Sequence, residues 1–249
     1  MDPYLDVLNN FNTLIVKQRP RGKWWELLCG LEHENEYKKS DILIAREHTS
    51  NGCLLCCGKY RKFKMTIRTL EGHEILKIKR PYHCGRQGCC CCCCVESCHQ
   101  EAEIFLGEAS SMPGKYLGRI KERFSCCLPV LNVFDDTGNE VYRVIGQCCG
   151  CSNYSLSIRQ GNGTSSGWGD DGDEVGEIEK KWSGWKKELF TDADNFFINF
   201  PPDSSSQQKA LLLGALFLVD YLFFENQSER SLMSDQISNP KIRNATHLS

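Results

Sequence analysis

The sequence predicts a mainly β fold in which one curved or closed antiparallel sheet is followed by a hydrophobic helix. Two predicted β-hairpins of similar layout, over 62–79 and 130–145, carry this prediction together with one long apolar segment near the end of the chain. Each hairpin is preceded by a Cys-Cys pair and followed by a cysteine cluster and another strand-like run. We interpret this as a degenerate internal repeat, which favours a single sheet over two unrelated domains.

Residues 1–40 are expected to form a helical docking segment. Their apolar residues recur at a spacing that suits one helical face, at Leu5, Leu8, Phe11, Leu14 and Ile15. The first ten residues, MDPYLDVLNN, contain no basic stretch followed by an apolar one. We therefore expect no signal peptide.

Residues 41–225 are expected to form the sheet domain. In the first hairpin Phe63, Met65 and Ile67 alternate with charged residues, and Glu71-Gly72 supplies the turn. In the second hairpin the turn is Asp-Asp-Thr-Gly-Asn at 135–139. The Gly- and acid-rich stretch 161–176 is expected to be a loop, and the polar residues 226–249 a frayed tail.

A hydrophobic helix is expected over 207–225. Its apolar part, Ala210 to Phe224, is fifteen residues, about 22 Å of helix against roughly 30 Å of bilayer hydrocarbon. Asp220 lies inside it, and a carboxylate near the bilayer centre is costly. We therefore expect a helix buried in the protein, with Asp220 meeting a donor or reaching the rim of the sheet.

Cysteine is the abnormal component, because seventeen occur in 249 residues. An odd number with six adjacent thiols does not suit a secreted disulfide framework, so a reducing compartment is expected. Three readings of the thiols stay open. Fatty acylation of the run is one, zinc bound at Cys53-x2-Cys56 and Cys148-x2-Cys151 is another, and an accident of low complexity is the third. The six adjacent thiols are Cys89, Cys90, Cys91, Cys92, Cys93 and Cys94.

The net charge of −2 gives no global attraction to nucleic acid or anionic lipid. A local basic patch is expected on one face of the first hairpin, next to the cysteine run. It is either an anionic-lipid contact or simply the solvated outer face of a sheet. Its residues are Lys62, Lys64, Arg68, Lys77 and Lys79.

The stretch from Asp192 to Asp203 resembles an EF-hand calcium loop, with acids at Asp192, Asp194 and Asp203. Phe197 stands where the sharp turn requires glycine. Calcium affinity here is expected to be weak, on the order of 10⁻⁴ to 10⁻³ M, and a plain β-turn is the alternative. Neither a Ser-His-acid set, a phosphate-binding glycine loop nor an HExxH motif is present, so bond-making catalysis is not expected.

The segments GLEHENEY, KRPYHCGRQGCCCCCC, ELFTDADNFFINFPPD and ALLLGALFLVDYLFFE resemble those of the phospholipid scramblase family, in the same order along the chain. The resemblance implies a closed antiparallel barrel of about twelve strands around the C-terminal hydrophobic helix, as in Tubby-like domains. It also implies calcium-dependent, ATP-independent, bidirectional movement of phospholipid between leaflets.

The family's acylation motif falls on Cys89 to Cys94, which implies covalent palmitate, with Cys92 in place of the motif's proline. Its calcium segment falls on Asp192, Asp194, Phe196, Ile198, Phe200 and Asp203. A long proline-rich N-terminal region is absent, so no SH3 or WW partner is expected. The family's basic import segment reads GEIEKKWSGW here, and its glutamates argue against nuclear import.

The leading hypothesis is therefore a palmitoylated protein on the cytosolic face of a membrane, most simply the plasma membrane, whose partner is phospholipid. A Tubby-like module that binds phosphoinositides or DNA without scrambling is the first alternative. A zinc-thiolate structural protein is the second.

Overall fold

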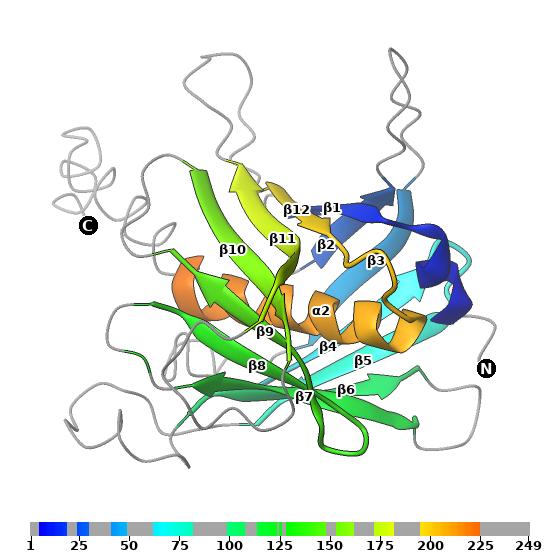
Figure 1. Cartoon of the computed structure of the whole chain (residues 1–249). Helices are drawn as coiled ribbons and strands as arrows, with labels where there is room; N and C mark the ends of the chain where they lie inside the picture. Colours follow the sequence, from blue (N-terminus) through cyan, green and yellow to red (C-terminus); the bar gives the residue numbers. More distant parts are fainter. Residues whose placement is uncertain are drawn as a thin grey trace, which may run out of the picture.

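Twelve strands form one closed antiparallel barrel around the helix α2 (Figure 1). This computed structural model describes residues 5–18, 24–29, 41–48, 62–81, 99–107, 114–123, 125, 128–147, 153–161, 172–181 and 195–224. The strands are β1 (Thr13–Gln18), β2 (Trp24–Cys29), β3 (Asp41–His48), β4 (Phe63–Thr69), β5 (Glu74–Arg80), β6 (Glu101–Leu106), β7 (Tyr116–Arg123), β8 (Val130–Asp135), β9 (Glu140–Gly146), β10 (Asn153–Gln160), β11 (Glu174–Lys181) and β12 (Asn195–Asn199). The helical elements are the 3₁₀-helix η1 (Leu5–Asn10), α2 (Ser206–Val219) and the π-helical turn η4 (Asp220–Phe224).

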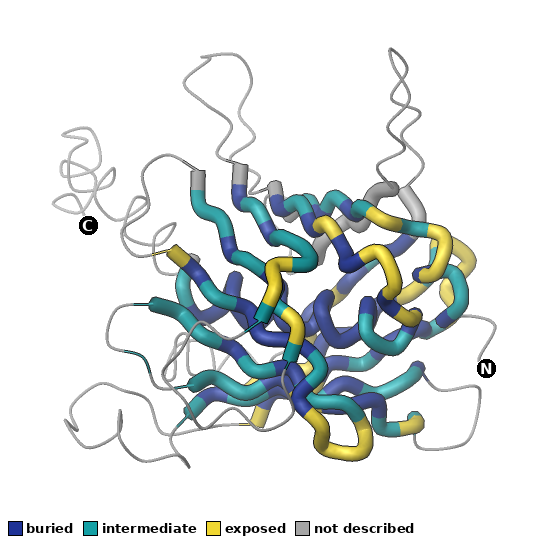
Figure 2. The backbone as a smooth tube through the Cα atoms, in the orientation of Figure 1, coloured by how far each residue is buried: buried dark blue, intermediate teal, exposed yellow. Residues whose placement is uncertain are grey.

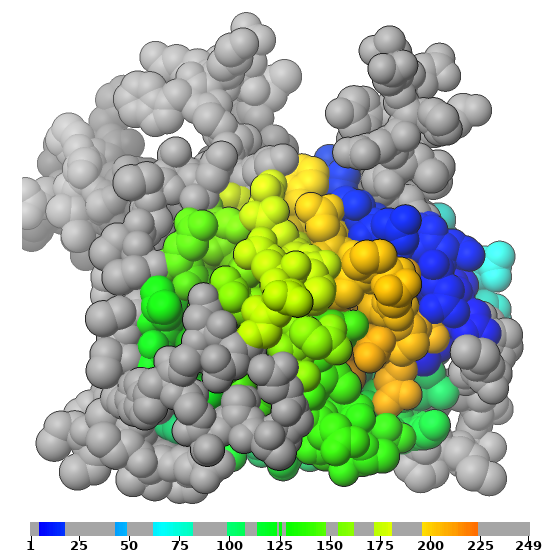
Figure 3. Space-filling model, in the orientation of Figure 1, coloured from blue at the N-terminus to red at the C-terminus, as the bar shows by residue number. Residues whose placement is uncertain are grey.

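The barrel closes through pairing between the first and the last strand. Strand order follows the chain from β2 to β12, and β1 pairs antiparallel with both of these strands. Leu14 lies opposite Ile198, and Val16 lies opposite Phe196. Figure 3 shows the N-terminal residues in blue directly against the chain that leads from β12 into α2. The predicted mainly β class and closed barrel around a hydrophobic helix are confirmed.

The predicted N-terminal docking helix is wrong. Residues Leu5–Asn10 form only a short 3₁₀-helix, and from Thr13 onward the chain is a strand of the barrel. Leu14 and Val16 are buried in the core, which is the two-residue period of a strand. Hydrogen bonding to two neighbouring strands therefore overrides the local helical spacing. The domain boundary expected at residue 40 falls inside the barrel, since β1 and β2 both precede it.

Both predicted hairpins are present, as β4–β5 and β8–β9, and the strands expected after them are β6 and β10. Gly72 and Gly138 hold positive φ angles of 93° and 89° at the two turns, where a side chain would be strained. In the second turn the Asp135 carboxylate accepts hydrogen bonds from the backbone N–H groups of Thr137 and Asn139 at 3.0 and 2.8 Å. Burial alone would raise the pKa of Asp135, but a hydrogen bond from the Thr137 hydroxyl at 2.7 Å, together with these backbone bonds, holds it below its ordinary value.

Helix α2 runs along the barrel axis with all of its faces buried (Figures 1 and 2). It begins at a capping box, in which Ser205 Oγ accepts from the Gln208 N–H and Gln208 Oε1 accepts from the Ser205 N–H. Its apolar residues join inward-facing residues of the strands in one core. Among the residues described, no helix has both the length and the hydropathy needed to cross a membrane. The expected buried helix is thus confirmed.

The N-terminal 3₁₀-helix covers the end of the barrel at which α2 begins. Leu5 and Leu8 are buried in the core, and Lys209 Nζ donates to the carbonyl oxygens of Asn9 at 3.3 Å and Phe11 at 2.7 Å. Burial lowers the pKa of the Lys209 ammonium group. These contacts tie the start of the helix to the start of the chain.

The expected loop over 161–176 is shorter than predicted, because β11 already begins at Glu174. Its residues 162–171 lie outside the described part of the chain, as does the tail 226–249.

Replacing Gly214 with leucine should destabilise the protein by about 3 kcal/mol, the upper range for overpacking a core. A Cβ atom at Gly214 would lie 2.4 Å from Ile104 Cδ1 and 3.0 Å from Ile120 Cδ1, on two barrel strands. Urea unfolding measures the effect, and Gly214→Ala should cost less. Since leucine is a better helix former and more apolar than glycine, unchanged or increased stability would show that α2 does not pack inside the barrel.

Candidate functional site

One end of the barrel collects the connectors that carry the cysteines. Strand order follows the chain and neighbours are antiparallel, so every connector after an odd-numbered strand starts and finishes at the same end, here called the cysteine rim. Every cysteine except Cys29 occurs between strands joined at this rim, namely β3–β4, β5–β6, β7–β8 and β9–β10. Cys29 ends β2 at the opposite end.

The predicted acylation run Cys89 to Cys94 itself lies outside the described residues, as do the zinc candidates Cys53, Cys56, Cys148 and Cys151. Pro81 and His99, the nearest described residues on either side of the run, lie beside the rim ends of β5 and β6. Within the described ranges no group of three metal-ligating side chains occurs.

A basic groove opens on the barrel wall next to the cysteine rim. Its volume is about 560 Å³. Strand register sets His48 opposite Lys64 and Lys64 opposite Lys79, which makes a row of three basic side chains across β3, β4 and β5. All three are exposed. The groove is lined by His48, Lys62, Phe63, Lys64, Lys79, Arg80, Pro81 and Glu103.

The basic patch predicted from the sequence divides into two parts. Arg68 and Lys77 lie toward the other end of the hairpin, and both pair with Glu74, Lys77 at 3.1 Å. Burial alone would raise the pKa of the Glu74 carboxyl, but the hydrogen bonds from Arg68 and Lys77 hold it below its ordinary value. Glu74 thus stays ionised and offsets the charge of this part.

In the other part, no ion pair among the described residues offsets the positive charge of Lys62, Lys64 and Lys79. The contact recorded for Lys79 is with the ring of Phe105, 4.2 Å from its centroid. Glu103 is the acid in the groove, and it lies between Lys79 and Arg119 in the register. Positive charge is therefore concentrated at the rim end of the hairpin.

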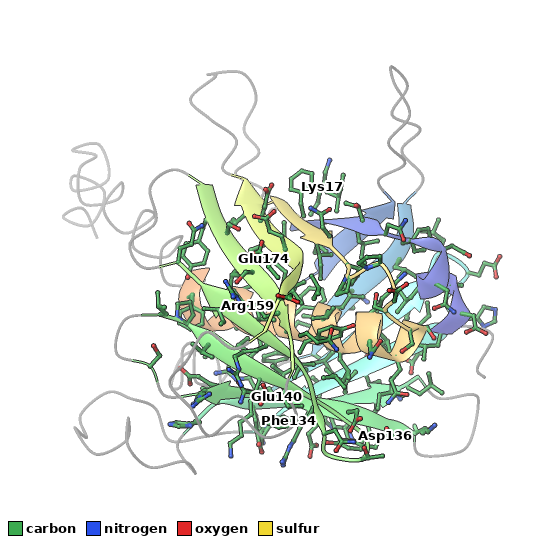
Figure 4. The ribbon with its side chains drawn as sticks, viewed as in Figure 1. Lys17, Phe134, Asp136, Glu140, Arg159 and Glu174 are labelled. Carbon is green, nitrogen blue, oxygen red and sulfur yellow. The ribbon has the colours of Figure 1, made fainter. Side chains whose placement is uncertain are left out.

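Bases on another part of the wall are matched by acids or carbonyl groups. Figure 4 labels Glu140, Arg159 and Glu174, which belong to β9, β10 and β11. Arg143 donates to Glu140 at 2.7 Å, and Arg159 donates to the carbonyl oxygen of Gly172 at 3.1 Å. The contrast shows that the row of lysines in the groove is not a general property of the outer wall.

A buried polar cluster occupies the barrel interior at the rim, next to the groove. Tyr221 donates to Glu47 at 2.5 Å and stacks on Phe63, with ring centroids 4.2 Å apart. Arg80 donates to Gln100 at 2.7 Å. Asp220, the C-cap of α2, is also buried here and has a polar or electrostatic partner. Asp220 thus meets a partner at this end of the barrel, as its cost in an apolar core requires.

Comparison with known proteins places this barrel in a family. The family description "Scramblase" matches residues 1–226. The chain belongs to the Scramblase family. It is 34% identical over 240 residues to phospholipid scramblase 1 of Mus musculus, covering 92% of this chain and 67% of that protein. Phospholipid scramblase 2 of Bos taurus is 34% identical over 231 residues, covering 90% of this chain and 72% of that protein. Phospholipid scramblase family member 5 of Homo sapiens is 27% identical over 235 residues, 91% of this chain and 79% of that protein. No solved structure matches this chain.

Four residues of the six-residue calcium set carried over to this Scramblase-family chain are described, and three of them are core side chains. Phe196 and Ile198 lie in β12, are fully buried in the core and pair with β1 and β11 on both sides. Phe200 is buried as well. The expected twelve-residue loop is therefore largely a barrel strand, whose backbone groups are already hydrogen-bonded.

Asp192 and Asp194 precede β12 and lie outside the described residues, whereas Asp203 follows the strand and is exposed. Five extended residues span about 16 Å, and calcium ligands lie within about 2.6 Å of the ion. Asp203 cannot share an ion with residues at the start of β12. It lies instead near Tyr142, whose pKa is raised by burial and, to a lesser degree, by the Asp203 charge.

Sequence reasoning missed Glu47, His48 and Tyr221. The position of Glu47 could have been predicted, because Leu43 and Ala45 face the core and the two-residue period of a strand places residue 47 on the same face. His48 joins the lysines only through the register between β3 and β4. Tyr221 could be assigned to the core, but its partner could not be named without the position of the helix in the barrel.

Tyr221→Phe should destabilise the protein by about 2 kcal/mol, since a buried carboxylate loses one of its donors. The phenyl ring keeps its stacking on Phe63, so the change isolates the hydroxyl group. Chemical denaturation gives the free energy of unfolding. Tyr116→Phe is the matched control, because this partly exposed tyrosine contacts Phe105 through its ring. Equal, small effects of the two substitutions would show that the bond to Glu47 does not stabilise the rim.

Proposed function

We propose that this protein moves phospholipid between the two leaflets of a membrane, in both directions and without ATP or bond-making chemistry. Membership of the Scramblase family over residues 1–226 carries the proposal. Phospholipid scramblase 1 of Mus musculus and phospholipid scramblase 2 of Bos taurus match over 92% and 90% of this chain, so the proposal concerns the barrel as a whole.

The proposed attachment to the membrane is through palmitate on Cys89 to Cys94, on the cytosolic face. α2 is enclosed by the barrel and is not offered to lipid. Two or more acyl chains make a durable anchor, each buried methylene contributing about 0.8 kcal/mol. The run is joined to the rim ends of β5 and β6, so the proposed anchor would hold the basic groove close to the lipid headgroups.

Calcium is proposed to act weakly through Asp192 and Asp194, which precede the rim end of β12. Neighbouring carboxylates repel one another until a cation neutralises them. This reduced pair replaces the six-residue set.

The basic groove is the observation that favours the alternative function, a binding module for anionic headgroups that does not itself scramble lipid. Lys62, Lys64 and Lys79 would suit phosphate in either case. The two functions differ in whether labelled lipid changes leaflet.

Purified protein in liposomes that contain fluorescent phospholipid tests the proposal. Dithionite quenches only outer-leaflet label, so scrambling should make the inner-leaflet fraction accessible, faster with calcium than without it. Asp192→Ala with Asp194→Ala should remove the calcium response and leave a basal rate. A protected inner-leaflet pool under all conditions would reject scrambling and leave the binding module.

Changing Cys89 to Cys94 to alanine should release the protein from cell membranes, because the acyl chains supply the anchor. Hydroxylamine, which cleaves thioesters, should release the wild-type protein in the same way. Alanine at Cys148, Cys149 and Cys151, a second cysteine cluster of the same rim, is the matched control and should leave the protein bound. Retention of the first variant in the pellet after carbonate washing would contradict the proposed anchor.

A further inference from the structure

Lys64 and Lys79 place like charges directly opposite one another on neighbouring strands, and the His48 imidazole lies opposite Lys64 on the other side. Directly opposed side chains have Cβ atoms about 5 Å apart, and like charges in these positions destabilise a sheet. Within the described part of the chain neither lysine forms an ion pair, and the carboxylate opposite Lys79, that of Glu103, also faces Arg119. On the same hairpin Glu74 does form ion pairs, with Arg68 and Lys77. The arrangement costs stability, which is typical of a site shaped for an anion rather than for the fold.

The groove also has an apolar side. Pro81 lines it together with the lysines, and the ring of the partly exposed Phe105 lies beneath the Lys79 ammonium group, whereas Phe63 is 2% exposed and packs inside the barrel. Pro81 is exposed at the rim end of β5, whereas Lys64 and Lys79 lie further along the wall. The ligand must therefore combine negative charge with apolar surface, as a phospholipid does and a free phosphate does not.

We infer that the groove binds one anionic phospholipid. Its phosphate lies between Lys62, Lys64 and Lys79, and its glycerol and upper acyl carbons lie against Pro81 and Phe105. This inference deepens the proposed function and rests on its claim of membrane contact. It replaces a diffuse electrostatic attraction with a discrete headgroup site on the outer wall of the barrel.

Lys64→Glu separates this role from a role in folding. The substitution sets a carboxylate opposite Lys79, so the repulsion between two ammonium groups becomes an attraction and the melting temperature should rise or stay unchanged. Binding to anionic lipid should fall about tenfold or more, because each basic charge near an anionic leaflet is worth about a factor of five. The matched control is Lys115→Glu, the same change at an exposed lysine just before β7, at the end of the barrel away from the rim.

The measurement uses the unacylated full chain and sucrose-loaded vesicles of phosphatidylcholine, with and without phosphatidylserine or phosphatidylinositol bisphosphate. Wild type and Lys115→Glu should sediment equally with the anionic vesicles, and Lys64→Glu should remain in the supernatant. Equal binding of all three proteins would overturn the inference. Equal competition by soluble glycerophosphoserine or inositol trisphosphate would overturn its lipid part, and preferential binding of duplex DNA through Lys64 would overturn the choice of ligand.

The dithionite assay on the same three proteins separates the two claims. If wild type scrambles lipid and Lys64→Glu binds vesicles and scrambles as well as wild type does, the groove is rejected and the proposed function is kept. Loss of vesicle binding in Lys64→Glu, with no scrambling by wild type, would keep the groove and reject the proposed function.

Discussion

The structure depends on the burial of a helix that is apolar on every face. A helix of this kind cannot lie on a surface and must be surrounded, and the twelve strands supply the enclosure. Most of the buried residues described on these strands are aliphatic or aromatic, from Leu14 on β1 to Ile198 on β12. Close approach is needed as well as apolarity. Gly118 on β7 holds a φ of 146°, and a Cβ there would lie 2.9 Å from Leu211 of the helix.

The two ends of this enclosure are chemically different. At one end the 3₁₀-helix and the Lys209 ammonium group cover the start of α2, and few ionisable groups are needed. At the cysteine rim, Glu47, Arg80 and Asp220 are buried around the end of the helix. The charged wall groove lies beside that same rim, and so do the strand ends that all four multi-cysteine connectors join. The two ends of the barrel are therefore not equivalent, and the proposed anchor would orient the barrel with its cysteine rim toward the membrane.

Much of this architecture could be predicted from local pattern. Phe63, Met65 and Ile67 alternate with charged residues, the turns contain glycine, and Ala210 to Phe224 is too short and too acidic for a span. What failed depended on contacts distant in sequence. Leu5 and Leu8 have a helical spacing, and the predicted helix wrongly continued into the residues that pair with β12. The local sequence contains no sign that these residues close a barrel.

The candidate site shows the same limit. Local pattern placed five basic residues on one face, but only the structure shows that Glu74 forms ion pairs with two of them and that Lys64 faces Lys79. The calcium pattern matched acids at the right intervals and could not reveal that the residues between them are core positions of a strand.

Closure between β1 and β12 also governs when this protein can fold. The side chains of Thr13 and Asn199, which are 186 residues apart in sequence, are joined by a 2.9 Å hydrogen bond across the seam. On a ribosome, the N-terminal strand waits for nearly the whole chain to be made, and the helix that fills the core is synthesised later still. Until then both edges of the growing sheet offer unpaired backbone groups to other chains. Such long-range pairing is intrinsically slow, and the sheet has no closed form until β12 has been made.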